Sequence, residues 1–436
     1  MVAASLETRG AGRSPWLILE RRAPAKLLTR TSMTRRIVLP ALALLAFAGS
    51  PLGAQQPIPI AEVPAAPAAT RAELVSRLDS LASALLAAGT AVGVQVAVVR
   101  GGDTLLLRGY GLADREARRA TKLDQRFRIG SVTKQFTAAA VMRLAERGKL
   151  SLDDDLSRWV PEFPLQGHRV RLGQLLNHTS GISNYTESPV EEARAADDMT
   201  PLEVVGLVAR DTFDFAPGTR LSYTNTGYAL LGLVIERVSG LPYAEYVRRE
   251  LFAPLGLRHT SYCPSRPQGA EWASGYAPQD DGVIVSAEYL SMTHPYAAGA
   301  LCSTVGDLVA WQHALAAGRV VSAGSYARMT TPETLASGER LTYGYGLVVI
   351  QYLGHRLIMH EGGINGFSAS LLRFPVDSLD VVVLCNTERG GSGVLAQNLS
   401  RAVLGAPLLR FPPEPPPPAP TAPIGTTVPR APSHAP

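Results

Sequence analysis

Ser131 and Lys134 are the residues whose types and spacing most directly suggest chemistry, because they pair a possible nucleophile with a possible base. A serine hydroxyl is a weak nucleophile until a base takes its proton, and a lysine can do so only where its surroundings lower its pKa from about 10.4. Phe136, Ala140 and Leu144 follow at helical spacing, which predicts a helix that begins near Ser131. That helix brings hydroxyl and amine onto one face, beside unpaired backbone N–H groups. Alone, the same residues also describe a capped helix start with a solvated lysine.

Two later stretches could supply the remaining groups of a catalytic site. Tyr223-Thr224-Asn225 lies in a turn before a helical pattern, and His360-Glu361-Gly362-Gly363 ends an apolar strand pattern. A phenol with a lowered pKa can exchange protons with the lysine and a leaving group, and the carboxamide of Asn225 can hold the lysine and a substrate carbonyl. The N–H of Gly363 could join that of Ser131 in an oxyanion hole. Each stretch alone also fits a plain structural interpretation, as a helix start or a strand that ends in a turn.

Taken together and in this order, the three motifs resemble the penicillin-recognising serine hydrolases. The likeness is to the branch that contains class C β-lactamases, D,D-carboxypeptidases and related esterases, and it covers roughly residues 71–405. Three further stretches share it: Leu175–Ile182, Gly299–Thr304 and Asp307-Leu308.

The resemblance implies a role for each motif residue. Ser131 would be the acylated nucleophile, Lys134 its proton acceptor, and Tyr223 the group that protonates the leaving group and later activates water. The N–H groups of Ser131 and Gly363 would hold the oxyanion. The substrate would contact three residues, namely Asn225, His360 and Gly362.

His360 stands where class C β-lactamases usually have a lysine. A lysine is a constant cation suited to a β-lactam carboxylate, whereas a histidine titrates near neutrality. We therefore expect esters and D-amino-acid amides or peptides as substrates ahead of rapid β-lactam hydrolysis. The alternative is a non-catalytic protein that binds β-lactams or cell-wall fragments, or is acylated by them without turnover. No cofactor and no metal are expected, since the sequence has no zinc signature.

The elements that must position these residues describe an α/β fold. An amphipathic helix over Arg71–Ala88 precedes a hairpin of Val92–Arg100 and Thr104–Tyr110. Four strands return late in the chain: Leu347–Tyr352, Arg356–His360, Phe367–Phe374 and Leu379–Cys385. A helix over Val394–Leu404 closes the domain. We expect the hairpin and the late strands to form one antiparallel sheet flanked by helices, with a large, mainly helical region inserted at about residues 150–299.

The N-terminal residues predict that the protein is exported. Residues 1–54 hold eight lysines and arginines against two acidic residues, so the net charge of +5 arises there and nothing suggests nucleic acid. Met33–Ala54 has the pattern of a secretory signal, which predicts a periplasmic or secreted protein and makes Met33 a candidate start; N-terminal sequencing of the exported protein would decide. Residues 55–70 form a Pro/Ala linker and residues 406–436 a Pro-rich disordered tail.

Partners and cysteines complete the expectations. A small-molecule or peptide substrate is expected, no apolar run reaches the length of about 18 residues that a membrane span needs, and the oligomeric state stays open. Cys263 and Cys302 could pair across loops in an oxidising compartment. Cys385 lies in an apolar run and is expected to be a buried thiol.

Overall fold

The chain divides into two units, Met1–Ala69 and Thr70–Pro436. The computed structural model describes residues 70–210 and 212–410 of the second unit. The predicted signal peptide, the predicted linker up to residue 69 and the Pro-rich tail from residue 411 lie outside the described residues. The limits given above for the hydrolase domain and its insertion stay predictions.

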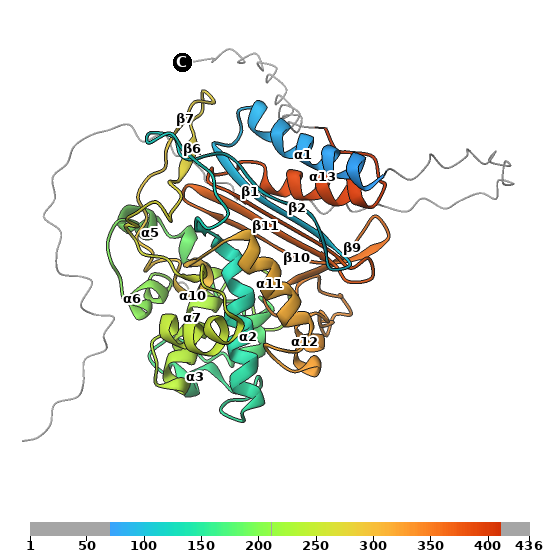
Figure 1. Ribbon diagram of the computed structural model, residues 1–436. Coiled ribbons are helices and arrows are strands. Elements are labelled where there is room, and N and C mark those ends of the chain that lie inside the picture. Colours follow the sequence, from blue (N-terminus) through green and yellow to red (C-terminus); the bar gives the residue numbers. More distant parts are fainter. Residues whose placement is uncertain (1–69, 211, 411–436) are drawn as a thin grey trace, which may run out of the picture. The chain divides into compact units, whose positions relative to one another are not determined.

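A seven-stranded antiparallel sheet organises the second unit, in the order β3-β2-β1-β12-β11-β10-β9 (Figure 1). Its strands are β1 (Gly93–Arg100), β2 (Asp103–Asp114), β3 (Arg119–Ala120), β9 (Val348–Tyr352), β10 (His355–Ile364), β11 (Phe367–Phe374) and β12 (Leu379–Cys385). The N-terminal hairpin therefore meets the late strands through β1 and β12, where Val96 lies opposite Val383. This confirms the predicted single sheet.

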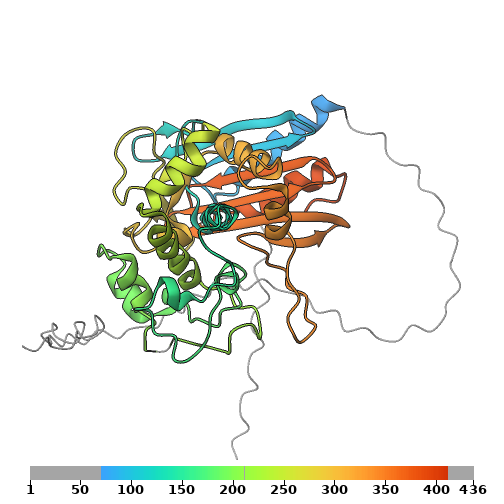
Figure 2. The ribbon, with the colours of Figure 1, turned by 90° about the horizontal axis from the view of Figure 1, so that it is seen from below.

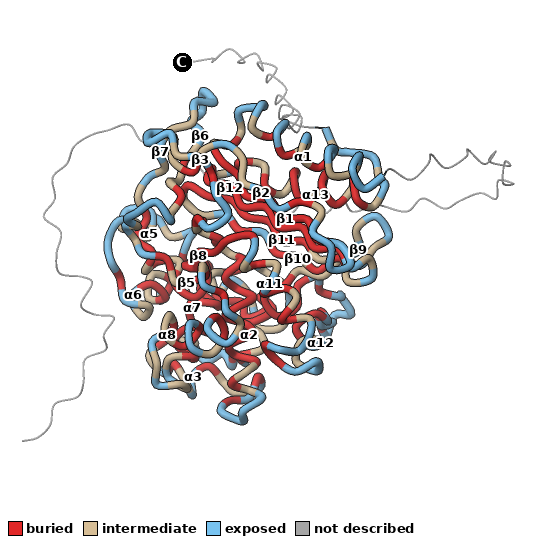
Figure 3. Tube along the Cα trace, in the orientation of Figure 1, coloured by how far each residue is buried: buried red, intermediate tan, exposed pale blue. Residues whose placement is uncertain are grey.

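Helices cover both faces of the sheet. The helices α1 (Arg71–Ala87) and α13 (Ser392–Val403) lie on one face, and α2 (Thr133–Glu146), α11 (Val305–Ala316) and α12 (Ala323–Met329) lie on the other (Figures 1 and 2). Because both faces are covered, β1 reads GVQVAVV without alternation and all seven of these residues are buried. The buried residues of the central strands form a continuous band between the helical layers (Figure 3).

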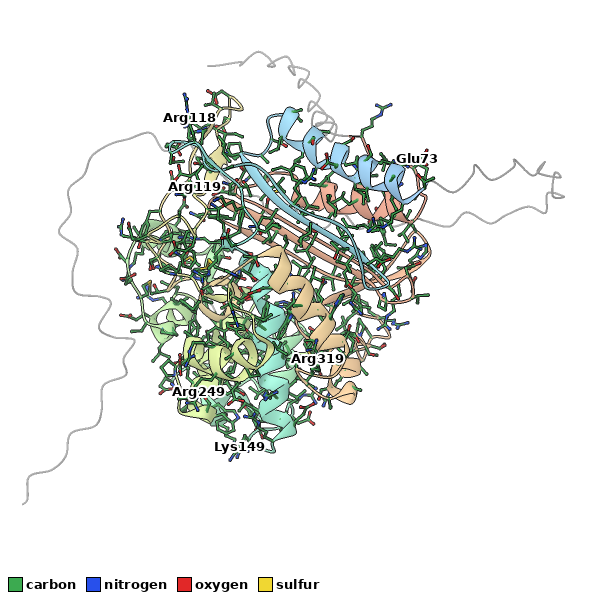
Figure 4. The ribbon with its side chains drawn as sticks, in the orientation of Figure 1. Glu73, Arg118, Arg119, Lys149, Arg249 and Arg319 are labelled. Carbon is green, nitrogen blue, oxygen red and sulfur yellow. A yellow bond between two sulfur atoms is a disulfide. The ribbon has the colours of Figure 1, made fainter. Side chains whose placement is uncertain are left out.

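The segment between α2 and α11 is mainly helical, as predicted. Its helices are α3 (Leu156–Trp159), α4 (Leu172–Leu176), η3 (Tyr185–Glu187), α5 (Pro189–Arg194), α6 (Pro201–Gly206), α7 (Asn225–Ser239), α8 (Tyr243–Val247), η4 (Arg248–Phe252), α9 (Ala253–Leu255) and α10 (Tyr296–Gly299). A short ribbon of β6 (Tyr276–Pro278) and β7 (Ile284–Ser286) interrupts them. Exposed charged side chains such as Lys149 and Arg118 mark the rim of the unit (Figure 4).

A three-stranded sheet and a disulfide support the segment that leads to Ser131. In this sheet β8 (Leu301–Ser303) lies between β4 (Phe127–Arg128) and β5 (Ser261–Tyr262). The sulfurs of Cys263 and Cys302 are bonded, so the cross-link joins β8 to the residue that follows β5. Cys385 is a buried free thiol. Within residues 70–210 and 212–410, no helix is long and apolar enough to cross a bilayer.

Candidate active site

Ser131 lies in a tight turn rather than in the first turn of an α-helix. The 3₁₀ turn η2 (Gly130–Val132) leads directly into α2, whose predicted apolar stripe is buried. Gly130 has a φ of +49°, and a Cβ at this position would lie 2.8 Å from the carbonyl oxygen of Gly363. A glycine is therefore required here, because the turn and strand β10 touch backbone to backbone.

Lys134 is fully buried and faces three oxygen atoms. Its Nζ lies 2.7 Å from Asn225 Oδ1, 2.9 Å from the carbonyl oxygen of Ala298 and 3.1 Å from Ser131 Oγ. Burial lowers the pKa of Lys134 well below its ordinary value. A neutral amine has two N–H bonds, which Asn225 and Ala298 satisfy, so that its lone pair is left facing the hydroxyl of Ser131.

Tyr223 completes a chain of hydrogen bonds on the other side of the nucleophile. Its hydroxyl donates to Ser131 Oγ at 2.7 Å. Tyr223 is 37% exposed as a residue, but its hydroxyl is bonded to Ser131, and desolvation raises the pKa of Tyr223. The expectation of a phenol with a lowered pKa is therefore wrong. The resting phenol keeps its proton, and this leaves Lys134 as the candidate base beside Ser131.

Asn225 begins α7, and its neighbours fix the orientation of its carboxamide. Thr224 caps the helix through its side chain, while the backbone N–H of Asn225 donates to Asn184 Oδ1 at 3.0 Å. The Nδ2 of Asn225 donates to Thr186 Oγ1 at 3.3 Å, so Oδ1 is the atom turned toward Lys134. The structure thus brings Asn225 to the lysine as the motif predicted.

Gly362 and Gly363 lie within β10, which continues beyond the predicted end at His360. The strand extends to Ile364 because Gly362 and Gly363 pair with Ala369 and Ser368 of β11. On its other edge, β9 reaches only Met359, and no strand of the described residues pairs with 360–364 there. A Cβ on Gly362 would lie 2.0 Å from the carbonyl oxygen of Ile129. An open strand edge therefore lies against the turn that carries Ser131.

His360 is a buried neutral imidazole. Its Nε2 lies 2.7 Å from the hydroxyl of Tyr343, and its Nδ1 lies 2.6 Å from the carbonyl oxygen of Glu361. Because that carbonyl only accepts, the proton is assigned to Nδ1, and Nε2 accepts from Tyr343. Desolvation and the nearby Lys134 lower the pKa of His360 to about 3. The expectation that this residue titrates near neutrality is therefore wrong.

Tyr343 and His178 are site residues to which sequence reasoning gave no functional role. His178 has a φ of 60° and accepts the backbone N–H of Thr224 through Nδ1 at 3.2 Å. Its ring lies 4.4 Å from that of Tyr223 and 4.5 Å from that of Tyr343, centroid to centroid. His178 could have been found from the sequence, because it lies in Leu175–Ile182, one of the stretches that carry the family resemblance. No sequence feature pointed to Tyr343. Together they support the ring of Tyr223 and the imidazole of His360.

We expect His360→Gln to lower kcat/KM several-fold. The acid limb of the profile of kcat/KM against pH should stay unchanged. An imidazole with a pKa of about 3 is neutral above that pH and gains a proton only below it, so it contributes no titration between about pH 5 and pH 8. The loss reflects the hydrogen bond to Tyr343, worth about 1 kcal/mol. The measurement is kcat/KM for a p-nitrophenyl ester as a function of pH, for the wild type and for this variant. An acid limb that disappears in the variant would contradict the buried neutral state.

Comparisons with known proteins identify relatives of this chain. Residues 78–405 match the family model described as Beta-lactamase. Penicillin-binding protein 4* of Bacillus subtilis is 28% identical over 307 residues, which are 67% of this chain and 68% of that protein. D-aminopeptidase of Brucella canis is 29% identical over 317 residues, 72% of this chain, and the chain spans only 60% of that relative's length.

A solved structure shows the same fold. The D-amino acid amidase from Ochrobactrum anthropi SV3, complexed with L-phenylalanine amide, matches with a TM-score of 0.67 and 27% sequence identity. The match covers 76% of this chain and 99% of the amidase chain. The antiparallel sheet flanked by helices is therefore a known arrangement among amide hydrolases.

Proposed function

The chain belongs to the Beta-lactamase family, whose D-aminopeptidase and D-amino acid amidase relatives are serine hydrolases, and from this we propose that it forms an acyl-enzyme on Ser131. The observation that carries the proposal is the position of the Ser131 hydroxyl, 2.7 Å from the hydroxyl of Tyr223 and 3.1 Å from the amine of Lys134. This places a nucleophile between a proton acceptor and a proton donor.

Acylation follows from this chain of hydrogen bonds. Neutral Lys134 takes the proton of Ser131 as Oγ bonds to the substrate carbonyl carbon, and the electron pair of the carbonyl moves to its oxygen. The N–H groups of Ser131 and Gly363 stabilise that oxyanion. When the oxyanion collapses, the bond to the leaving group breaks, and Tyr223 gives its proton to the departing nitrogen or oxygen. The phenol recovers a proton from Lys134, which becomes neutral again.

Deacylation uses the same groups in reverse. A water molecule gives its proton to the base formed by Tyr223 and Lys134, and its oxygen attacks the acyl carbon. The tetrahedral intermediate releases Ser131 Oγ, which takes the proton back. Asn225 keeps the amine of Lys134 in place through both half-reactions, because its Oδ1 accepts an N–H of the lysine.

D-amino-acid amides or peptides and carboxylic esters are the proposed substrates. The named activities of the D-aminopeptidase and D-amino acid amidase relatives support the amide class. Neutral His360 supports the proposal that β-lactams are poorer substrates than esters and amides, because a neutral side chain at this position provides no cation for the β-lactam carboxylate. We also propose export of the protein. The predicted signal at Met33–Ala54 supports it, as does the Cys263–Cys302 disulfide, a bond typical of oxidising compartments.

The test uses the protein from residue 55 to 436. The wild type is incubated with a fluorophosphonate and, separately, with a penicillin; peptide mapping then locates any adduct. Hydrolysis of the p-nitroanilides of D-alanine and L-alanine, a p-nitrophenyl ester and nitrocefin is followed in parallel. We expect one fluorophosphonate adduct on the Ser131 peptide and faster turnover of the ester and the D-anilide than of nitrocefin. A stable penicillin adduct with no turnover of any substrate would support the sensor alternative. A folded protein without an adduct would overturn the proposal.

A further inference from the structure

His294 is a buried histidine whose two ring nitrogens both face acceptors. Its Nδ1 lies 3.2 Å from the carboxylate of Glu191 in α5, and its Nε2 lies 2.9 Å from the carbonyl oxygen of Asp197. The side chain is 1% exposed. Because a carboxylate and a carbonyl both accept, the geometry assigns a proton to each nitrogen, and His294 is an imidazolium. The acyl-enzyme proposal leaves this buried cation without a role.

His294 joins two segments that flank the candidate site. The first segment, residues 183–199, contains η3 and α5, and the second, residues 291–298, leads into α10. Three further hydrogen bonds join these segments, from the Ser291 N–H to the carbonyl of Ala195, from the Met199 N–H to Thr293 Oγ1 and from the Tyr185 hydroxyl to the carbonyl of His294. The contacts of the imidazolium with Glu191 and Asp197 therefore reinforce a junction between the two segments.

Each segment helps to hold the amine of Lys134. In the second segment, the carbonyl oxygen of Ala298 accepts from Nζ at 2.9 Å. In the first segment, Thr186 Oγ1 accepts from Asn225 Nδ2 at 3.3 Å, which keeps Asn225 Oδ1 turned toward the lysine at 2.7 Å. A movement of one segment against the other therefore displaces an acceptor of the base, and the lone pair of the amine no longer faces Ser131.

The contacts of His294 depend on its protonation. Burial opposes the charged form, but the hydrogen bonds to Glu191 and Asp197 outweigh it and raise the pKa of His294 from its ordinary value. With a raised pKa in the folded state, the stabilisation is fully present below about pH 6.5, the unfolded value, and is lost as pH rises through the folded value. A neutral ring turns a lone pair toward one of its two acceptors, so one contact breaks.

The carboxylate that faces the imidazolium is that of Glu191. The titratable and charged side chains around His294 are Glu191 and Arg194 of α5, Asp197 and Asp198 of the following turn, and Tyr185 of η3. Arg194 is paired with the carboxylate of Asp197 at 3.0 Å, and Asp198 accepts from the hydroxyl of Ser291. Burial raises the pKa of Tyr185 well above its ordinary value, so its hydroxyl stays protonated.

We propose that the His294–Glu191 ion pair positions the two acceptors of Lys134, so that acylation of Ser131 slows when His294 loses its proton. The inference rests on the proposed function and adds a dependence on pH to it. His294 and Glu191 act through other residues, and their effect is expected on the rate of the acylation step.

The rate of phosphonylation by the fluorophosphonate and kcat/KM for the p-nitrophenyl ester, from about pH 6 to about pH 9, test the inference. The wild type should become about ten-fold slower on the alkaline side, because a base displaced by a fraction of about 1 Å reacts more slowly. Glu191→Gln should remove this decrease, because a carboxamide can accept from the imidazolium and can donate to the neutral ring. Glu191→Ala, which can do neither, should already be about ten-fold slower than the wild type at pH 6.

Asp377→Asn is the matched control, because it changes the carboxylate of another histidine pair. His355 Nδ1 lies 2.8 Å from Asp377 Oδ2, at the end of β10 that is far from Gly363. The pH profile of this variant should follow that of the wild type. A folded Glu191→Gln protein that keeps the alkaline decrease, or a wild type without one, overturns the inference.

Nuclear magnetic resonance of protein labelled with ¹⁵N-histidine tests the ion pair without any substrate. At about pH 6 both ring nitrogens of His294 should be protonated, and His294→Gln identifies their resonances by removing them. An unprotonated nitrogen in this ring overturns the inference and leaves the proposed function standing. Absence of any Ser131-dependent reaction, with the ring doubly protonated, overturns the proposed function and the inference with it.

Discussion

Replacement of Ser131 by alanine is expected to lower kcat/KM for every substrate by at least about 10⁴-fold, because the variant has no atom that can form the acyl-enzyme. The amine of Lys134 and the phenol of Tyr223 remain, but the oxygen that lies between them, 3.1 Å and 2.7 Å away, is lost. The measurements are ester hydrolysis and the intact mass after incubation with a fluorophosphonate. Both the turnover and the mass increase should vanish.

Ser183→Ala is a suitable control for this prediction. The hydroxyl of Ser183 bonds to the carboxylate of Asp214 and has no place in the proposed chemistry, so this variant should keep its turnover and its adduct. Far-ultraviolet circular dichroism of both variants shows whether they are folded. A folded Ser131→Ala protein that still turns over the ester would place the nucleophile elsewhere.

Lys134→Met is expected to lower kcat/KM by about 10³-fold to 10⁴-fold, because methionine fills the space of the lysine stem but cannot accept a proton. Lys134→Arg should be equally impaired, since a guanidinium stays protonated in proteins. The rate of phosphonylation by the fluorophosphonate reports the attack of the Ser131 hydroxyl alone, because no deacylation step follows it. An active Lys134→Arg enzyme would contradict the assignment of Lys134 as the base.

The same substitution has a pH-dependent effect on stability. Burial lowers the pKa of Lys134 in the folded protein, whereas the unfolded chain keeps the ordinary value of about 10.4. Between these two values the unfolded state binds more protons, so this group makes the free energy of unfolding rise with pH. The Met variant lacks that contribution. Urea unfolding from about pH 6 to about pH 9 should therefore show the stability difference moving in favour of the wild type as pH rises.

Much of the fold could be predicted because the local apolar patterns of the sequence correspond to helices and strands in the structure. The hairpin, the late strands and the terminal helices have clear apolar periodicity, and β1 and β12 are bounded nearly as predicted. The motif residues Ser131, Lys134, Tyr223 and Asn225 could be grouped because the order of their motifs resembles a known family, and each lies just before a helix or in its first turn. Their meeting required only that the inserted helical region pack on α2.

Other features depend on tertiary contacts that no local pattern reveals. The pKa directions of Tyr223 and His360 follow from burial, which is a property of the assembled site. Strand β10 runs through two glycines because β11 pairs with them, although a glycine inside a strand weakens it. Tyr343 lies 17 residues before His360 in a loop without periodicity, so its bond to the imidazole had no sequence signature.

The central place of β1 has a consequence for the synthesis of the protein. This early strand lies between its hairpin partner β2 and the late strand β12, and the N–H of Gly363 that joins Ser131 comes from the equally late β10. A nascent chain that has emerged only as far as α12 already contains Ser131, Lys134 and Tyr223. It still lacks β12, the late partner of β1, and half of the proposed oxyanion hole. Reactivity therefore begins only after the last strands leave the ribosome, and folding must wait for contacts between the two ends of the domain.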